Sequence, residues 1–166
     1  MNISAHVSYL EATHSDMAKR LSIDNIPNVE QLENIKILAE KVFEPIREHF
    51  NVPIYISSFF RSKELNKKLK GAKNSQHMLG EAMDIDADMY GKITNKQIFD
   101  YIRLNLNFDQ LIAEGLIEGS TNPSWIHCSY SENKNRSEIL LMEKVGNNSI
   151  YYKYDKQKGL DLCSYR

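Results

Sequence analysis

The stretch NSQHMLGEAMDID, residues 74–86, joins a polar loop to a short segment in which polar and apolar side chains alternate. His77 lies in the loop, and Asp84 lies seven positions later, inside the alternating segment. Because successive side chains of a β-strand point to opposite faces, Asp84 lies on the face opposite Met83 and Ile85. The stretch therefore predicts a loop followed by a strand. His77 and Asp84 either bind one metal ion or are an ordinary loop histidine and a surface carboxylate.

Length and composition indicate a globular chain. The 166 residues are most simply one domain, 1–166, which can bury roughly 70% of its unfolded surface. Hydrophobic residues make up 42% and charged residues 26%, which is not the composition of a disordered chain. The net charge of −1 gives no reason to expect nucleic acid as a partner. Cys128 and Cys163 lack CxxC spacing, which favours a reducing compartment.

The sequence predicts neither membrane insertion nor secretion. No apolar stretch approaches the about 20 residues of a membrane span. The N-terminus, MNISAHVSYLEATHSD, has no basic region followed by an apolar core, so we expect synthesis in the cytoplasm without a signal peptide. We expect the chain to be a monomer.

Residues 28–50 have the pattern of an amphipathic helix. Asn28 is suited to cap its N-terminus. Pro45 should kink the helix or divide it in two, because proline has no backbone N–H. The apolar positions recur at steps of three and four and are Val29, Leu32, Ile35, Leu38, Val42, Ile46 and Phe50.

Shorter helices and several strands follow. Ser62 is suited to cap a helix that ends near Gly71, and Thr94 with Gln97 forms a capping box for another. The last two strands flank a Gly-Asn-Asn sequence at 146–148, which is typical of a hairpin turn. These elements predict an α+β fold with helices packed on a mostly antiparallel sheet. The segments rich in β-branched and aromatic residues are 52–58, 108–114, 124–130, 138–145 and 149–155.

A third candidate ligand lies in SWIHCSY, residues 124–130. Alternation puts His127 and Cys128 on opposite faces of this strand, so Cys128 is expected in the core. Two neighbouring strands could direct Asp84 and His127 to one point, with His77 reaching in from its loop. Three protein ligands, often histidines with one carboxylate, form a catalytic zinc site. The spacing alone leaves the alternative open. Structural or surface roles are expected for the other histidines, His6, His14 and His49.

Several segments, in the same order, resemble one family. SSFFRS (57–62), LNKKLKGAKNSQHMLGEAMDID (65–86) and WIHCSY (125–130) are similar to segments of the zinc D-Ala-D-Ala carboxypeptidase and endolysin peptidase family, which shares its fold with the hedgehog signalling domain. The likeness runs from about residue 8 to about residue 131 and leaves a C-terminal hairpin, about 137–155, outside it. The matching positions are Ser58, Arg61, Ser62, Ser75, His77, Gly80, Ala82, Asp84, Trp125 and His127.

The resemblance implies one Zn²⁺ per chain, bound by His77, Asp84 and His127. It also implies that Arg61 and Ser75 bind the charged end of the substrate. The planar guanidinium of Arg61 suits a carboxylate or a developing oxyanion. The resemblance further implies a hedgehog/DD-peptidase-like arrangement of the α+β fold.

The general base departs from the family pattern. Many relatives place an acid three residues before the last zinc histidine, where this chain has Ser124. Zinc peptidases need a carboxylate within hydrogen-bond reach of the attacking water. The best replacement is Glu114, which an antiparallel hairpin would put beside His127. Glu118 is the runner-up, and Asp86 comes next.

A second departure concerns the mouth of the substrate site. The family's usual SGYRS is SSFFRS here, with Phe59 where glycine is common and Phe60 where tyrosine is common. This aromatic bulk could narrow the pocket or provide an apolar wall.

The resemblance implies a zinc metallopeptidase that hydrolyses peptidoglycan stem peptides, most simply a D-Ala-D-Ala carboxypeptidase. One alternative is a phage-type endolysin peptidase that cuts the L-Ala-D-Glu bond. Another is a non-catalytic, hedgehog-like zinc-binding module, which would need the ligands but not Glu114. The lack of a signal sequence suits a phage lysin that acts on the cell wall after release, or a cytoplasmic enzyme acting on wall precursors.

Overall fold

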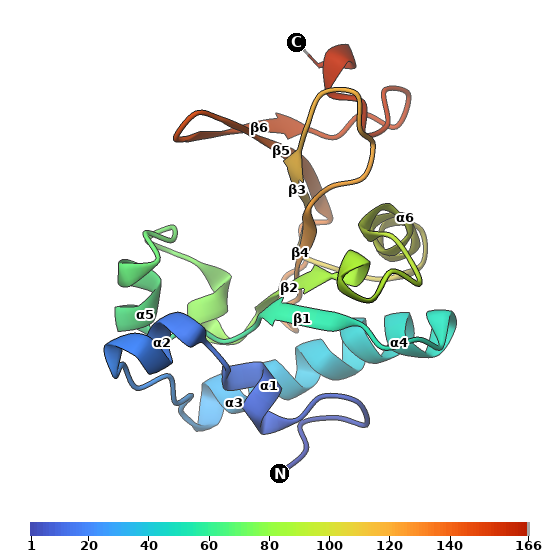
Figure 1. Cartoon of the computed structure of the whole chain (residues 1–166). Coiled ribbons are helices and arrows are strands. Elements are labelled where there is room, and N and C mark those ends of the chain that lie inside the picture. The colour runs from blue at the N-terminus through green and yellow to red at the C-terminus, as the bar shows by residue number, and fades with distance from the viewer. Residues whose placement is uncertain (166) are drawn as a thin grey trace.

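The computed structural model describes residues 1–165, and within them the chain folds around one six-stranded sheet (Figure 1). The strand order is β1-β2-β4-β3-β5-β6. Neighbouring strands are antiparallel except for β3 and β5, which are parallel. The strands are β1 (Tyr55–Ser58), β2 (Ala82–Asp86), β3 (Gln110–Leu116), β4 (Trp125–Ser129), β5 (Glu138–Val145) and β6 (Asn148–Lys153).

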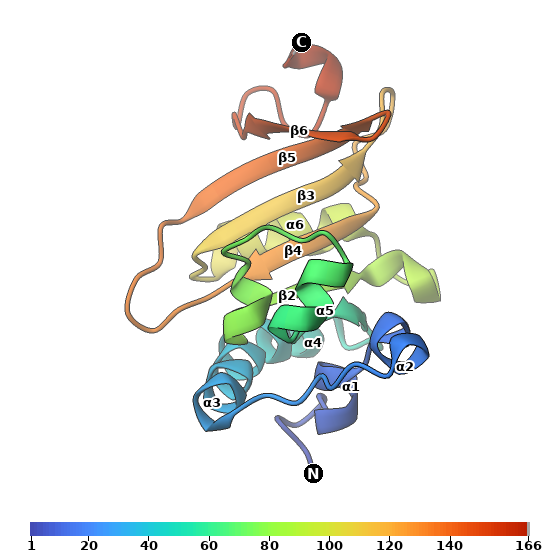
Figure 2. The same ribbon diagram turned by 90° about the vertical axis from the view of Figure 1, so that its left-hand side faces the viewer.

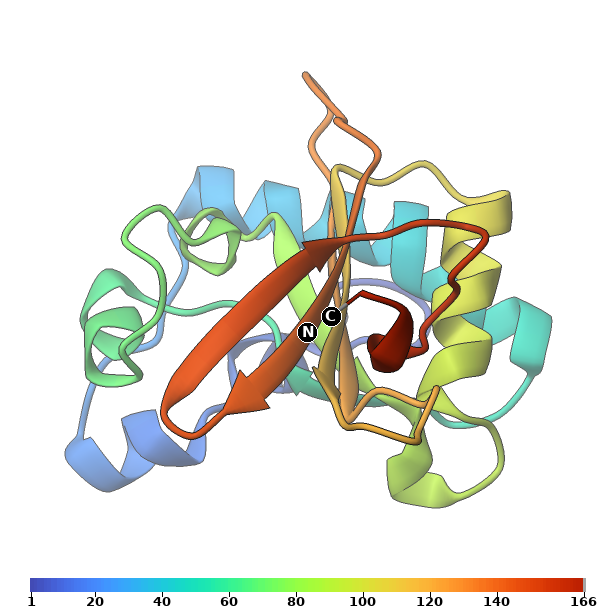
Figure 3. The same ribbon diagram turned by 90° about the horizontal axis from the view of Figure 1, so that it is seen from above.

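The helices cover the two faces of the sheet unequally. In Figures 1 and 3, α6 lies on one side of the strands and α5 on the other, while α3 and α4 run past the β1 end. The strands above α5 are left without a helix on that side (Figure 2). The helices are α1 (Tyr9–Thr13), α2 (Asp16–Leu21), α3 (Val29–Leu38), α4 (Glu44–Phe50), α5 (Lys63–Lys68) and α6 (Asn95–Asn105). Short helical turns are η1 (Ala39–Phe43), η2 (Gln76–Leu79), η3 (Ala87–Tyr90) and η4 (Leu162–Ser164).

The long helix is divided as its proline predicts. Asn28 caps α3 through a capping box with Gln31, and the π-helical turn η1 joins α3 to α4. Pro45 is the second residue of α4, directly after this wider turn, because its missing N–H interrupts the helical hydrogen bonds. The predicted apolar stripe is buried in its middle, but its first member, Val29, is 87% exposed.

The other local predictions are also confirmed, with one exception in the sheet. Ser62 caps α5, and Thr94 and Gln97 form the capping box of α6. The β5–β6 hairpin turns at Gly146 and Asn147. The parallel pairing of β5 with β3 is not apparent from the sequence. It arises because the connection after β4 crosses β3, so β5 pairs with the far edge of β3.

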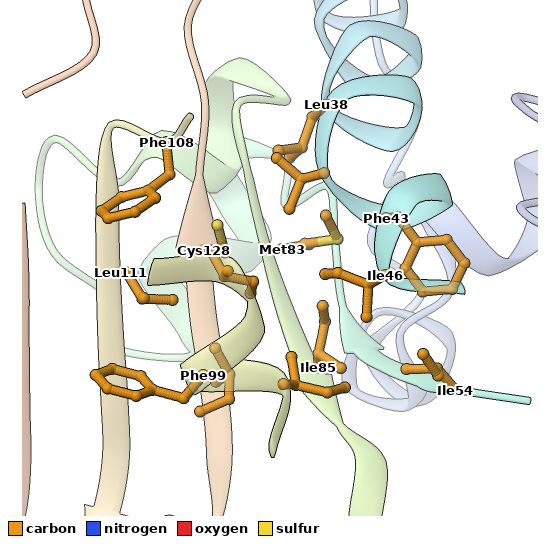
Figure 4. Close-up of a cluster of buried hydrophobic side chains, with 14 of the residues drawn as sticks. Leu38, Phe43, Ile46, Ile54, Met83, Ile85, Phe99, Phe108, Leu111 and Cys128 are labelled. Atoms are coloured by element: carbon orange, nitrogen blue, oxygen red, sulfur yellow. The ribbon is translucent and has the colours of Figure 1, made fainter. Parts of the chain in front are cut away.

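The core lies between the sheet and the helices. Met83 and Ile85 of β2, Leu111 of β3 and Cys128 of β4 face α6 and the α3–α4 helices, as Figure 4 shows. Cys128 is fully buried, as its strand position predicts. The opposite faces of the same strands carry Asp84, Glu114 and His127. Within residues 1–165, no helix is both long and apolar enough to cross a membrane.

Helix α3 holds the loop that carries His77. Gln31 Nε2 donates to the Met78 carbonyl oxygen at 2.8 Å, and Asn34 Nδ2 donates to the Leu79 carbonyl oxygen at 2.9 Å. Gly80 ends this loop with φ +76°, and a Cβ atom there would lie 2.5 Å from the Gln31 carbonyl oxygen. The loop can approach α3 this closely because residue 80 has no side chain.

Replacing Gly80 with alanine should therefore destabilise the fold by more than the strain of a positive φ angle alone. We expect Gly80→Ala to lower the free energy of unfolding by about 2–4 kcal/mol, because strain at positive φ adds to a clash with α3. Gly91 is the matched control, since it also has positive φ (+65°) but a Cβ atom there would meet no other atom within 4 Å. Gly91→Ala should cost about 1–2 kcal/mol. Urea denaturation measures the free energy of unfolding of both variants. Equal losses in Gly80→Ala and Gly91→Ala would show that the contact with α3 is not a constraint.

Candidate metal centre

Sheet pairing brings two of the predicted ligands together. Asp84 of β2 lies opposite His127 of β4 in the antiparallel register. Both side chains point to the face that α6 does not cover. His77 comes from η2, directly before β2, and reaches the same point. Three elements thus contribute one ligand each, as the strand-face argument predicts.

The three side chains form a compact and buried group. His127 Nδ1 lies 2.9 Å and His77 Nε2 lies 3.2 Å from the same oxygen, Asp84 Oδ1. The candidate ligand atoms all lie within 4.8 Å of one another. The three residues are 3% (His77), 7% (Asp84) and 9% (His127) exposed. Among residues 1–165, this is the one group of three or more histidine, cysteine or acidic side chains arranged to hold a metal ion.

Hydrogen bonds from outside the group orient its members. His77 Nδ1 lies 2.6 Å from the Phe59 carbonyl oxygen. A carbonyl oxygen can only accept, so Nδ1 carries the proton and Nε2 presents its lone pair to the centre. The Arg61 guanidinium donates to Asp84 Oδ2, and Arg61 Nε donates to Ser58 Oγ at 2.8 Å. Asp84 Oδ1 is thereby directed at the two histidines.

The protonation states suit metal binding. Burial lowers the pKa of His77, so its imidazole is neutral at neutral pH. Burial alone would raise the pKa of Asp84, but its contacts with His77 and His127 outweigh burial and lower that pKa well below the usual value. A neutral imidazole, as at His77, and an ionised carboxylate, as at Asp84, are the forms that bind a metal. Two nitrogens and one oxygen at this spacing fit a three-ligand zinc site.

The other histidines lie elsewhere. His6 Nδ1 contacts Glu44 Oε2 at 2.6 Å. His14 lies 3.2 Å from Asp16 on the surface, and His49 stacks on Tyr101 with ring centroids 4.2 Å apart. These positions agree with the structural and surface roles expected for them.

Glu114 is the acidic side chain that shares a cavity with the three ligands. The cavity has a volume of about 860 Å³ and is lined by Glu114, His77, Asp84 and His127, among others. Glu114 lies opposite Trp125 in the predicted β3–β4 hairpin, two residues along from the pair Ile112–His127 and therefore on the same face. Burial, and then the charge of Asp84, raise the pKa of Glu114 to about 7.

The two alternative carboxylates do not line this cavity. Glu118 lies in the loop after β3, where its Oε1 is 3.7 Å from Cys163 Sγ. Asp86 accepts a hydrogen bond from Asn95 Nδ2 at 3.2 Å. Of the three acidic candidates, the structure therefore places only Glu114 beside the centre.

Of the remaining residues predicted at the site, two line the cavity and two lie in the core. Arg61 and Ser75 both line the cavity, and Ser75 Oγ makes no hydrogen bond to a group within residues 1–165. Phe59 and Phe60 are only 1% and 2% exposed and belong to the hydrophobic core. The prediction that they narrow or line the substrate mouth is therefore wrong. The strand ends at Ser58, and the chain then turns both rings inward.

Residues from the C-terminal part of the chain also line the cavity, and sequence patterns alone assign no role to them. They include Arg136, Leu140 and Tyr151. Arg136 is held by buried Asp109, with Nε–Oδ1 at 2.8 Å and Nη2–Oδ2 at 2.7 Å. These hydrogen bonds lower the pKa of Asp109 to about 2. Alternation within 149–155 puts Tyr151 on one face of its strand, and the predicted hairpin pairs that strand with 138–145. Neither feature indicates that the hairpin lies beside β3 and so borders the cavity.

The buried ligand group, with a carboxylate beside it in an open cavity, is the arrangement of a metal-dependent hydrolase. Residues 5–129 match the family model described as Peptidase M15. This is more than half of the chain, so the chain belongs to the M15 peptidase family, whose members are zinc-dependent metallopeptidases. A search of curated proteins finds no significant match.

Purified protein should contain about one zinc ion per chain. We expect His77→Ala, Asp84→Ala and His127→Ala each to abolish tight zinc binding, because each removes one of only three protein ligands. Elemental analysis after dialysis measures the metal content. His14→Ala is the control, since it removes a surface histidine, and it should leave the zinc content unchanged. Full occupancy in His127→Ala would contradict the assignment.

Proposed function

We propose that this protein is a zinc metallopeptidase that hydrolyses peptidoglycan stem peptides, most simply a D-Ala-D-Ala carboxypeptidase. Membership of the M15 family supports a peptidase that acts on peptidoglycan-type substrates. The observation that supports a catalytic role is the position of Glu114, beside the three ligands in the same cavity. A zinc-binding module has no use for a half-buried carboxylate with a raised pKa beside its ligands, whereas a hydrolase needs one.

The three ligands and Glu114 have separate tasks in this proposal. His77 Nε2, His127 Nδ1 and Asp84 Oδ1 would hold the zinc ion. When bound, zinc supplies a Lewis acid that polarises the scissile carbonyl and acidifies water. Glu114 takes the proton from the attacking water and delivers it to the leaving amine. Its place in the same cavity as the ligands puts Glu114 in position for both proton transfers.

Arg61 and Ser75 are proposed to bind the charged end of the substrate. Arg61 is only 19% exposed in its side chain and already donates to Ser58 and Asp84. A guanidinium has five N–H groups, so these bonds leave others for a substrate carboxylate or oxyanion. The hydroxyl of Ser75 faces the same cavity and can donate a further hydrogen bond.

The length of the cavity is compatible with one alternative, a phage-type peptidase that cuts the L-Ala-D-Glu bond. Cavity-lining residues follow β3 from Gln110 to Glu114, which spans about 13 Å at the rise of a strand. Two terminal residues of a peptide extend over at most about 7 Å. The cavity therefore has room on both sides of a scissile bond. In this alternative a monomer would reach the cell wall after release from the cytoplasm.

Product analysis distinguishes these activities. Zinc-loaded protein should convert a muramyl pentapeptide to a product that has lost one alanine, as measured by mass spectrometry. A cut at the L-Ala-D-Glu bond would establish the endolysin alternative instead. Failure to cleave both this peptide and intact cell walls would overturn the proposed hydrolase and favour a non-catalytic zinc module.

Glu114→Gln tests the proposed proton acceptor. The substitution keeps size and hydrogen bonding but removes the basic group, so kcat should fall about 10²–10⁴-fold with little change in KM or zinc content. Glu118→Gln is the matched control and should retain full activity, because Glu118 lies outside the cavity. An active Glu114→Gln together with an inactive Glu118→Gln would show that the base comes from the loop.

A further inference from the structure

The β5–β6 hairpin forms one side of the cavity although it lies outside the family match, which ends at residue 129. Leu140 of β5 and Tyr151 of β6 both line the cavity. Figures 1 and 3 show the hairpin extending beyond the rest of the sheet on the side where α5 lies. The part of the chain that matches the family therefore supplies the ligands but not this wall.

Strand register explains why Tyr151 faces the centre. Leu140 lies opposite Ile112, which in turn lies opposite His127. Tyr151 lies opposite Met142, two residues after Leu140 and hence on the same face of the hairpin. The neighbouring Tyr152 points the other way.

The two adjacent tyrosines have different environments. Tyr152 donates from its hydroxyl to Glu143 Oε1 at 2.6 Å and packs against the core. Tyr151 is 52% exposed, and its hydroxyl makes no hydrogen bond to any group within residues 1–165. Packing and hydrogen bonding thus account for Tyr152, whereas nothing in the fold requires the hydroxyl of Tyr151.

The charges around Tyr151 define what its hydroxyl can bind. Burial, followed by the negative charges of Glu114 and Asp84, raises the pKa of Tyr151. The phenol therefore stays protonated and can donate a hydrogen bond at neutral pH. A carbonyl oxygen of a peptide bond is an acceptor that suits such a donor.

We propose that Tyr151 is a specificity-determining substrate contact, whose ring forms a wall of the cleft and whose hydroxyl donates to a backbone carbonyl oxygen of the bound peptide. This inference rests on the proposed peptidase function. In the proposed reaction, Tyr151 neither binds the metal nor transfers a proton. Its contribution is to hold the peptide beside Glu114.

Tyr151→Phe isolates the hydroxyl group. Loss of one neutral hydrogen bond made equally in the ground and transition states should raise KM about 2- to 10-fold and leave kcat and zinc content unchanged. Tyr151→Ala also removes the ring and should raise KM further. Ile150→Ala is the matched control, since Ile150 is an exposed residue of the same strand on the opposite face, and it should match the wild type. A wild-type KM in Tyr151→Phe would overturn the proposal.

A binding measurement separates this proposal from the peptidase function itself. Zinc-loaded Glu114→Gln protein labelled with 3-fluorotyrosine is titrated with the stem pentapeptide, and the Tyr151 ¹⁹F resonance is assigned by its loss in Tyr151→Phe. We expect this resonance to shift. If it shifts although the wild type cleaves nothing, the contact stands and the peptidase function fails. If the wild type cleaves but the resonance does not move, the Tyr151 proposal fails and the peptidase function stands. If the wild type cleaves nothing and the resonance does not move, both the Tyr151 contact and the peptidase function fail.

Discussion

The buried carboxylate of Asp84 is the constraint around which the polar half of this protein is arranged. An ionised carboxylate that is 7% exposed is costly unless other groups compensate its charge. Here one oxygen meets His77 and His127, and the other accepts from Arg61. These partners come from η2, from β4 and from the connection between β1 and α5. A single buried charge therefore ties four segments of the chain to one another.

The sheet can carry this group because its two faces differ. Met83 and Ile85 place one face of β2 in the core, which α6 and the α3–α4 helices complete (Figure 4). Asp84, which lies between them in the sequence, must then point to the opposite face. That face has no helix over its centre, so the polar groups border a cavity instead of a core. The stability of the fold and the accessibility of the site thus result from the same alternation.

Two parts of the chain build the cavity, and they differ in their relation to the M15 family. The matched part, residues 5–129, supplies His77, Asp84, His127 and Glu114. The hairpin beyond it supplies Leu140 and Tyr151. Arg136, in the connection between β4 and β5, is held by Asp109 of the matched part. The groups that would perform the chemistry hence lie in the part of the chain that matches the family. The opposite wall of the cleft belongs to a segment that the family model does not describe.

The sequence by itself determined the features that depend on local geometry. Alternation assigned Asp84, His127 and Cys128 to their faces, and short-range hydrogen bonding placed the helix caps, because both act over a few residues. Tertiary structure alone decided the parallel pairing of β3 with β5, the burial of Phe59 and Phe60, and the raised pKa of Glu114. Each of these depends on which distant segments come into contact. Burial and strand partnership are properties of the packed chain, and local periodicity does not encode them.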